Sequence, residues 1–167
     1  KKAKRLRRRR QLIALGVVGA IVIAGLIALT TVLALKLDDR NNTNDLRASA
    51  TKSARQFAID FSTYDYRHLD QDFAKVSAHL APSFRAQYAS TTASLKSIVV
   101  QYRGVATASV QGVGVTSVSS KKAVVVVFLD QQVTNSATKT PRIDRNRLEV
   151  TLQRSKGQWL LSDLQLK

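Results

Sequence analysis

One long uncharged segment restricts how this chain can fold more than any other feature. Residues 12–35 form a run of 24 positions without a charge, and only Thr30 and Thr31 are polar. As a helix the run would be roughly 36 Å long, against a bilayer hydrocarbon core of about 30 Å. It is apolar on every side, unlike a helix that packs on a soluble core. It is also too long for the apolar region of a signal peptide, and no small-x-small cleavage motif follows it. The run therefore predicts a single transmembrane helix.

The charges on either side of this segment predict its orientation. Eight of the first ten residues are Lys or Arg and none is acidic, whereas residues 36–40 carry balanced charge. Because basic flanks stay in the cytoplasm, residues 1–11 should be cytoplasmic and lie near anionic lipid headgroups. We expect residues 36–45 to be a polar linker and residues 46–167 to form one extracytoplasmic, periplasmic domain. The sequence contains no Met, so we expect a further segment to precede residue 1.

The composition argues against several classes of function. The net charge is +16, but eight of the 27 basic residues lie in the N-terminal flank, and the other 19 outnumber the 11 acidic residues by only eight. These 19 are scattered and form no basic stripe with interleaved aromatics, so we expect no nucleic-acid partner. The absence of Cys excludes disulfides, thiolate nucleophiles and Cys-ligated zinc.

Motifs for metals and cofactors are also missing from the sequence. The two histidines, His68 and His79, fall on different predicted elements, and neither has a second His or Cys close in sequence. Zinc normally requires three or four protein ligands, so we expect no metal site. The chain contains neither Gly-x-Ser-x-Gly nor a glycine-rich phosphate loop, and we expect no cofactor.

Apolar periodicity predicts three helices after the linker. The first begins at an N-cap near Asn44 or Asp45 and ends near Tyr64, a second, shorter helix follows, and Pro82 opens the third. Their predicted buried positions are Leu46, Ala50, Ala54, Phe57, Ala58 and Phe61; then Leu69, Phe73, Val76 and Leu80; and finally Phe84, Tyr88, Leu95, Ile98 and Val99.

After the third helix the sequence changes to patterns typical of strands. Residues 102–118 are rich in Val, Thr and Ser, and three glycines among them indicate a long strand that is bent or bulged. Residues 122–134 contain AVVVVFL, a run typical of a strand buried on both faces, and residues 147–154 alternate between apolar and polar. Gly157 suits a tight turn before a last strand at residues 159–166. This order predicts an α+β domain with helices on one face of a curved four-stranded antiparallel sheet.

The order of these elements resembles the NTF2-like (cystatin-like) cone fold. Four segments are more specific: ARQFAIDFSTYDYRHLDQDFAKV, FRAQY, VVVVFLDQQVTN and PRIDRNRLEVTLQRSKGQWLLSDLQ. Together with the basic flank and the single span, they resemble the Mce-associated membrane proteins of mycobacteria and related actinobacteria. The resemblance implies an accessory subunit in the plasma (inner) membrane that serves an Mce-type lipid or sterol importer, a kind of ABC transporter. The implied partners are permease helices in the membrane and Mce subunits outside it. The family has no agreed catalytic motif, so the resemblance transfers no active-site residue.

The stretch TYDYRHLDQDF, residues 63–73, has two interpretations. In the first it is an active site, because it places His68 close to Asp65, Asp70 and Asp72. Some NTF2-like isomerases and dehydratases use His and Asp for acid–base chemistry inside the cone.

In the second interpretation the same stretch is a structural corner between two helices. Asp70 would cap the second helix, Tyr64 and Tyr66 would bury their rings, Arg67 would pair with a carboxylate, and Phe73 would pack in the core. We favour the corner, because caps and turn residues occur wherever helices meet.

Three arginines form another candidate site. Arg142, Arg145 and Arg147 surround Asp144 just before a predicted strand. Guanidinium groups suit carboxylates and phosphates, so these residues are a possible contact for an acidic partner or a lipid headgroup. Local ion pairs at the solvated start of a strand are the alternative.

A row of small residues follows one side of the predicted span. Gly16, Ala20, Ala24 and Ala28 recur every four positions. Such a row lets helix backbones approach closely, although Gly and Ala are common in membrane spans and chance is an alternative. We interpret this row as an interface with another membrane helix.

Together with what the resemblance to Mce-associated proteins implies, these observations lead us to expect a non-enzymatic accessory subunit of a lipid-import complex. One alternative is a membrane-tethered NTF2-like isomerase or dehydratase, which would need a polar, ligand-sized cavity with His68 or an Asp pointing inward. Another is a bitopic scaffold subunit of a type IV secretion-like machine, which would share the layout of cytoplasmic tail, single span and NTF2-like domain.

Overall fold

The computed structural model describes residues 31, 42–138 and 140–167. Residues Thr43–Lys167 form one compact unit. Among the described residues, no helix combines the length and the apolar character that a membrane crossing requires. The predicted basic flank, the predicted span except Thr31, and the row of small residues lie outside this description; that row is Gly16, Ala20, Ala24 and Ala28.

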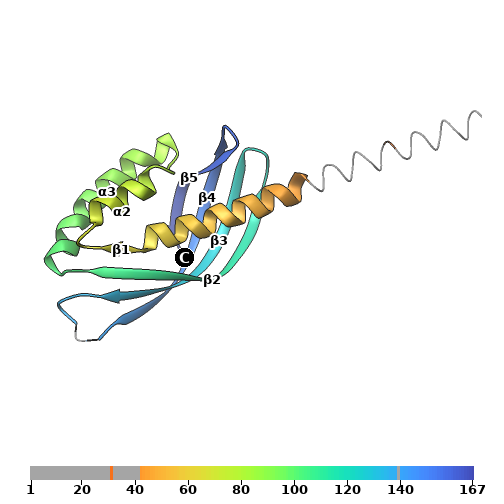
Figure 1. The fold of residues 1–167 in the computed structure, drawn as a ribbon. Helices are drawn as coiled ribbons and strands as arrows, with labels where there is room; N and C mark the ends of the chain where they lie inside the picture. Colours follow the sequence, from red (N-terminus) through yellow and green to blue (C-terminus); the bar gives the residue numbers. More distant parts are fainter. Residues whose placement is uncertain (1–30, 32–41, 139) are drawn as a thin grey trace, which may run out of the picture. The chain divides into compact units, whose positions relative to one another are not determined.

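The described part of the domain has three helices and a sheet, and the short first strand of the sheet lies between the first two helices in sequence (Figure 1). A long first helix covers residues 42–62, so residues 42–45 are helical and do not belong to the linker in which the sequence analysis placed them. The other elements are β1 (Tyr64–Asp65), α2 (Leu69–Ser77), α3 (Pro82–Gln101), β2 (Val105–Val118), β3 (Lys122–Thr134), β4 (Arg142–Ser155) and β5 (Gln158–Leu166).

The sheet has five strands in the described residues, and the prediction of four was wrong. All neighbours are antiparallel, and their spatial order, β1-β2-β3-β4-β5, is the order of the chain. The missed strand is β1, where Tyr64 and Asp65 pair with Ala106 and Val105. Two residues are too few to show the alternation that identifies a strand in sequence.

The sheet curls strongly around its concave face (Figure 1). The register between β2 and β3 shifts at Val110/Gly112 and again at Val115/Ser117. Each shift is a bulge that increases local twist, which confirms the predicted bend near the glycines. The β4–β5 turn also follows the prediction, because Gly157 has a φ of 82° that glycine adopts without strain.

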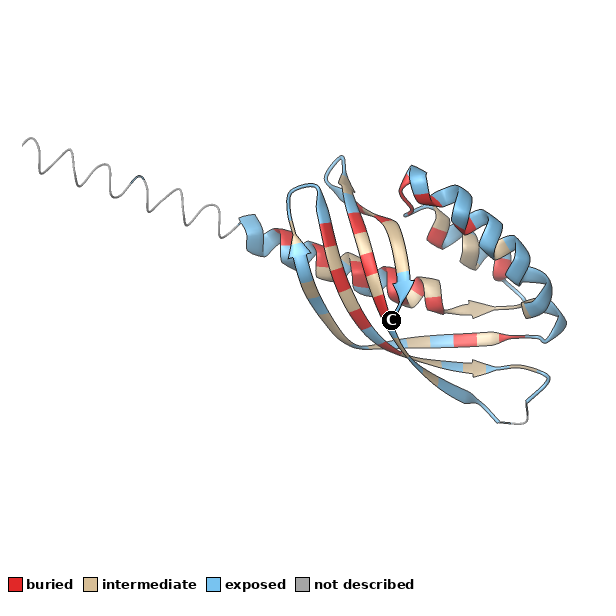
Figure 2. Ribbon diagram, turned by 180° about the vertical axis from the view of Figure 1, so that it is seen from behind, coloured by how far each residue is buried: buried red, intermediate tan, exposed pale blue. Residues whose placement is uncertain are grey.

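The core lies between the first helix and the concave face of the sheet, as the bands of buried residues in Figure 2 show. The predicted apolar face of the first helix is buried from Leu46 to Ala58, with Phe61 packed at its margin. The sheet contributes alternate residues of three strands; the fully buried ones with large side chains are Val125, Val127, Leu129, Val150, Leu152 and Leu161.

The predicted buried face of α3 is correct only in its first half. Phe84 and Tyr88 are buried, but Leu95 and Ile98 are 46% and 53% exposed. The apolar spacing continues along α3, but the second half of the helix contributes no buried residue to the core. Leu95 lines a cavity and does not pack in the core.

Polar contacts attach the first helix to the rest of the domain. The buried carboxylate of Asp60 accepts a hydrogen bond from Gln56 and pairs with Lys75 of α2 at 2.5 Å. At the other end of the helix, the indole N–H of Trp159 donates to Ser49 Oγ at 3.0 Å. These contacts hold α2 and β5 against the same helix.

Candidate functional site

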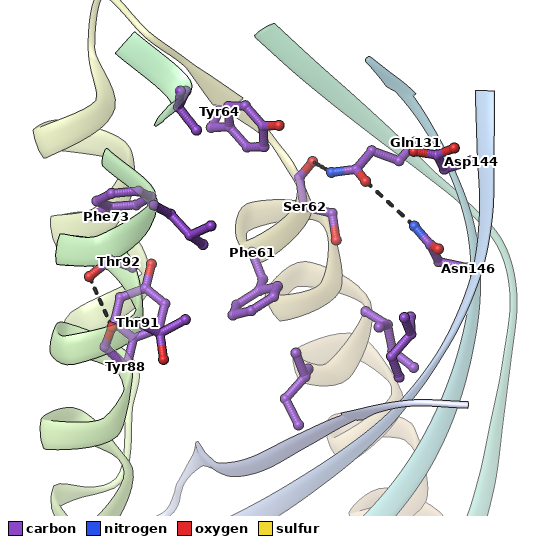
Figure 3. Close-up of a pocket in the computed structure, with 15 residues that line it drawn as sticks. Phe61, Ser62, Tyr64, Phe73, Tyr88, Thr91, Thr92, Gln131, Asp144 and Asn146 are labelled. Carbon is purple, nitrogen blue, oxygen red and sulfur yellow. Dashed lines mark hydrogen bonds between the residues drawn. The ribbon is translucent and has the colours of Figure 1, made fainter. Parts of the chain in front are cut away.

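A cavity of about 440 Å³ opens between the end of the first helix, α2, α3 and the sheet (Figure 3). Its volume is within the range of roughly 300–1,000 Å³ that is usual for small-molecule sites. Its walls come from every described element except β2, so the completed fold creates it. The lining residues are Phe61, Ser62, Tyr64, Phe73, Tyr88, Thr91, Thr92, Leu95, Val99, Gln131, Asp144, Asn146, Leu148, Leu164 and Leu166.

One wall of the cavity is aromatic. Tyr88 of α3 stacks obliquely on Phe61, with ring centroids 6.0 Å apart, and meets Phe73 of α2 edge-on at 6.3 Å. Burial, with a smaller contribution from the charge of Asp72, raises the pKa of Tyr88 to about 12, so its ring remains neutral. Aliphatic side chains of α3, β4 and β5 continue this apolar surface.

The opposite wall is polar (Figure 3). Gln131 of β3 donates to the carbonyl oxygen of Ser62 at 2.7 Å and accepts a longer bond of 3.5 Å from Asn146. Asp144 lies directly across from Gln131 in the β3–β4 register. The hydroxyl of Tyr64 points toward this group, and burial raises the pKa of Tyr64, with Asp144 adding to the shift and Arg142 opposing it.

Several polar atoms of this wall have no hydrogen-bond partner in the part of the chain that the structure describes. They are the hydroxyls of Ser62 and Tyr64, Oδ1 of Asp144 and Oδ1 of Asn146. Each belongs to a residue that lines the cavity. The cavity therefore offers two hydroxyls and two acceptor oxygens to a guest.

The carboxylates of residues 63–73 have structural partners. Asp65 accepts hydrogen bonds from the side chain and backbone of Arg67, which lower the pKa of Asp65 to about 2. Asp72 accepts from the backbone N–H of Asp65 at 2.9 Å, and Asp70 pairs with Lys96 of α3 at 2.5 Å. These contacts connect β1 to α2 and α2 to α3.

The structure differs from the predicted corner in two details. Asp70 does not cap α2, because His68 occupies the N-cap position and makes no capping bond with its side chain; Asp70 lies in the first turn instead. Tyr66 is only partly buried, and the guanidinium of Arg67 lies 5.9 Å from the centre of its ring. Tyr64 and Phe73 contribute to the corner and also line the cavity.

The acid–base pair of the enzyme interpretation is not assembled in the cavity. His68 is exposed and does not line it, and the ring of His79 packs against Phe57 elsewhere in the domain. Across the described residues no three His, Cys, Asp or Glu side chains gather as metal ligands. The acidic side chain that does line the cavity is Asp144.

The three predicted arginines do not form one cluster, and they do not precede the strand. They lie inside β4, where successive side chains alternate between faces. Arg142 pairs with Asp144 at 2.8 Å, whereas Arg145 and Arg147 lie on the other face, around a shallow depression with Phe128 and Lys167. The structure thus separates one arginine from the other two.

Sequence reasoning missed the polar wall of the cavity. Gln131 and Asn146 were not singled out, and Tyr64 and Asp144 were assigned other roles. A usable signal was present in β4, because Asp144, Asn146 and the buried Leu148 are spaced by two and therefore share a face. When polar residues extend the same face of a strand that is buried further along, they indicate that this face lines a cavity.

These features define an NTF2-like α+β domain, with three helices and a curled five-stranded antiparallel sheet around a cavity. Solved structures share this fold. An IcmL-like type IV secretion system protein from Legionella pneumophila has a TM-score of 0.58 at 16% identity, covering 72% of this chain and 91% of that one. The periplasmic domain of DotI gives 0.59 at 14% identity, with coverages of 72% and 94%. A scytalone dehydratase candidate from Novosphingobium aromaticivorans gives 0.55 at 18%, with coverages of 74% and 87%.

The chain belongs to the family described as "Uncharacterized protein Rv1363c/MT1408-like", whose family model matches residues 12–166. Two relatives come from Mycobacterium tuberculosis. Rv1362c is 29% identical over 125 residues, which cover 74% of this chain and 57% of the relative. Rv1363c is 26% identical over 145 residues, which cover 87% and 56%. The chain thus spans little more than half the length of the curated relatives that it matches.

Proposed function

We propose that this protein is a non-enzymatic accessory subunit of a cell-envelope complex. Its N-terminal segment would anchor it in the plasma membrane with the N-terminus in the cytoplasm, and its NTF2-like domain would contact other subunits on the outer side. The single observation that carries this proposal is the use of residues 63–73: the carboxylates of that stretch join structural elements, and His68 lies outside the cavity. This use of the stretch supports a structural role for it over a catalytic one.

The complex that we propose is an Mce-type importer of lipids or sterols. The sequence resemblance to Mce-associated proteins supports it, and so does the mycobacterial origin of the relatives. In this role the domain would dock on and stabilise Mce subunits, while the membrane helix packs against the permease.

Two other candidate functions each have an observation in their favour. A scaffold of a secretion-like machine is favoured by the fold shared with the IcmL-like protein and with DotI. A tethered isomerase or dehydratase is favoured by the cavity that Asp144 lines and by the fold shared with the dehydratase candidate.

Affinity purification of the full chain from its native membrane, followed by mass spectrometry, separates the proposed complex from a secretion machine. An ABC ATPase, a permease and Mce subunits should accompany the chain. Recovery of secretion-system proteins in their place would support the scaffold alternative and overturn the Mce assignment.

The same purification tests the row of small residues in the predicted span. Replacing Ala20 and Ala24 together with Leu should prevent close approach of a neighbouring helix, because backbone contact at such rows depends on small side chains. Leu is as compatible with lipid as Ala, so the variant should reach the membrane at normal level and lose its partners in mild detergent. The matched control replaces Val18 and Val22 with Leu on the opposite side and should keep them. If both variants retain their partners, the row is not an interface.

A pair of substitutions in residues 63–73 tests the structural role against the enzymatic one. Phe73→Ala removes a ring that packs on Tyr88 and should cost about 2–3 kcal/mol of stability, which lowers the amount of protein in the membrane. His68→Gln should leave both the protein level and lipid uptake near normal, because the imidazole is exposed. Immunoblotting and uptake of a labelled lipid measure the two effects. Loss of uptake by His68→Gln at an unchanged protein level would favour the enzyme.

A further inference from the structure

The cavity combines two features that select its ligand. The rings of Phe61, Phe73 and Tyr88 and several aliphatic side chains form one side of it, where α3 also contributes the hydroxyls of Tyr88, Thr91 and Thr92 (Figure 3). The amide and carboxylate groups gather on the wall contributed by β3 and β4, beside Ser62 and Tyr64. Such a cavity fits a mainly apolar molecule that carries a polar group at one end, since apolar walls provide the affinity and a few polar groups fix the orientation.

The polar wall carries no excess of positive charge. No Lys, Arg or His lines the cavity among the described residues, and the charge of Asp144 is balanced by Arg142, which binds its Oδ2. An anionic headgroup would lie beside the Asp144 carboxylate and the acceptor oxygen of Asn146 without a cation to compensate. Burying an uncompensated charge is costly, so the wall favours a neutral headgroup.

The unpartnered atoms indicate which neutral group fits. Oδ1 of Asp144 and Oδ1 of Asn146 are acceptors that can take a hydrogen bond only from a donor, whereas the hydroxyls of Ser62 and Tyr64 both donate and accept. A ligand hydroxyl can donate to one of the acceptor oxygens while it accepts from Tyr64 or Ser62. An ester or a ketone only accepts, and it would leave the acceptor oxygens unpaired.

We propose that this cavity binds a neutral apolar alcohol, with the hydroxyl among Tyr64, Asp144 and Asn146 and the hydrocarbon against Phe61, Phe73 and Tyr88. This is a ligand-binding function in addition to subunit assembly, and it does not depend on which complex the chain joins. Leu95 and Leu166, which line the cavity and are 46% and 69% exposed, mark the side from which the ligand enters.

Photolabelling of the full chain in phosphatidylcholine vesicles tests this site. The probe is dodecanol with a diazirine on its chain, and the comparison probe is the carboxylic acid of the same chain and diazirine. The alcohol should form adducts that excess dodecanol suppresses and that mass spectrometry maps to the cavity residues of α3 and β4. The acid should label these residues several-fold less.

Three variants sharpen the result. Leu95→Trp fills the entrance from a half-exposed position and should reduce cavity adducts about tenfold while circular dichroism shows an intact fold. Asn146→Leu removes one hydrogen-bonding partner and should reduce them about two- to tenfold. The matched control, Gln132→Leu, changes the exposed neighbour of Gln131 on β3 and should have no effect.

Three results would overturn the proposal. The first is adducts confined to residues 12–35, which would mean labelling from the lipid phase alone. The second is equal cavity labelling by the alcohol and the acid, which would contradict the neutral headgroup. The third is undiminished labelling in a folded Leu95→Trp protein. If Leu95→Trp does not fold, Asn146→Leu and the acid comparison decide.

Discussion

Replacing Leu161 with Ala should lower the free energy of unfolding of the domain by about 3–4 kcal/mol. Leu161 is fully buried in β5, and its backbone N–H and carbonyl bond to residues 79 and 81 at the junction of α2 and α3. A Leu→Ala change at such a site removes transfer free energy and leaves a void, which together cost about 2.7–5 kcal/mol in well-packed cores. That is a large share of the 5–15 kcal/mol typical of whole domains.

Denaturant unfolding of the full chain measures this change, and the single Trp of the sequence provides the signal. Trp159 lies two positions from Leu161 and is itself 5% exposed, so its emission should report unfolding of the core. The control is Leu166→Ala in the same strand, where the side chain is 69% exposed and the change should stay within about 0.5 kcal/mol. Equal stabilities for the two variants would contradict the packing described for β5.

Removing Trp159 should have a comparable effect, for a different reason. The Trp159→Ala variant should lose about 3–5 kcal/mol, because the buried ring packs against the first helix and Arg154 lies 5.7 Å from its centre. Trp159→Phe keeps much of the ring but loses the hydrogen bond to Ser49, so it should lose clearly less. Unfolding followed by circular dichroism measures these changes without the Trp signal.

The hydrogen bond between Trp159 and Ser49 can be measured separately by a double-mutant cycle. Ser49→Ala should cost about 1 kcal/mol in the wild type and less in the Trp159→Phe background, where the indole donor is already absent. Equal costs in the two backgrounds would show that the bond contributes nothing beyond packing.

Much of the fold could be predicted from the sequence, because its main elements have strong periodic patterns. The predicted bounds of β3 are the observed ones, Lys122–Thr134, and the alternation of β4 identified its inner face. The predictions failed where an element was too short to show a pattern, and where an apolar pattern continued onto a surface that the core does not bury. β1 has two residues, and the apolar spacing of α3 continues beyond its buried residues Phe84 and Tyr88 to Leu95 and Ile98, which are exposed.

The candidate site was harder to predict because it belongs to no single segment. Its polar wall joins Ser62 and Tyr64 with Gln131, Asp144 and Asn146, which are far apart in the chain and meet only when the sheet curls. From the sequence, residues 63–73 were considered as the candidate active site instead, because several ionisable side chains occur there together. In the structure the Asp side chains of this stretch mostly connect neighbouring elements. The charged residues that are close together in sequence connect neighbouring elements of the fold. The amides and hydroxyls that form the polar wall of the cavity are dispersed along the chain.

The simple strand order of the sheet has a consequence for how the domain is assembled. From β1 to β5 every strand pairs with the next strand along the chain. The strands β2 to β5 follow one another without a helix between them, so each of their three hairpins can form as soon as its second strand is available. The contact of Trp159 with Ser49 joins residues 110 positions apart, and it requires closure of almost the whole domain. Because a chain is synthesised from its N-terminus, β5 is the last of these strands to be made. The apolar face of the first helix would thus stay partly exposed until β5 packs against it. During this time a chaperone or a partner subunit could bind that face.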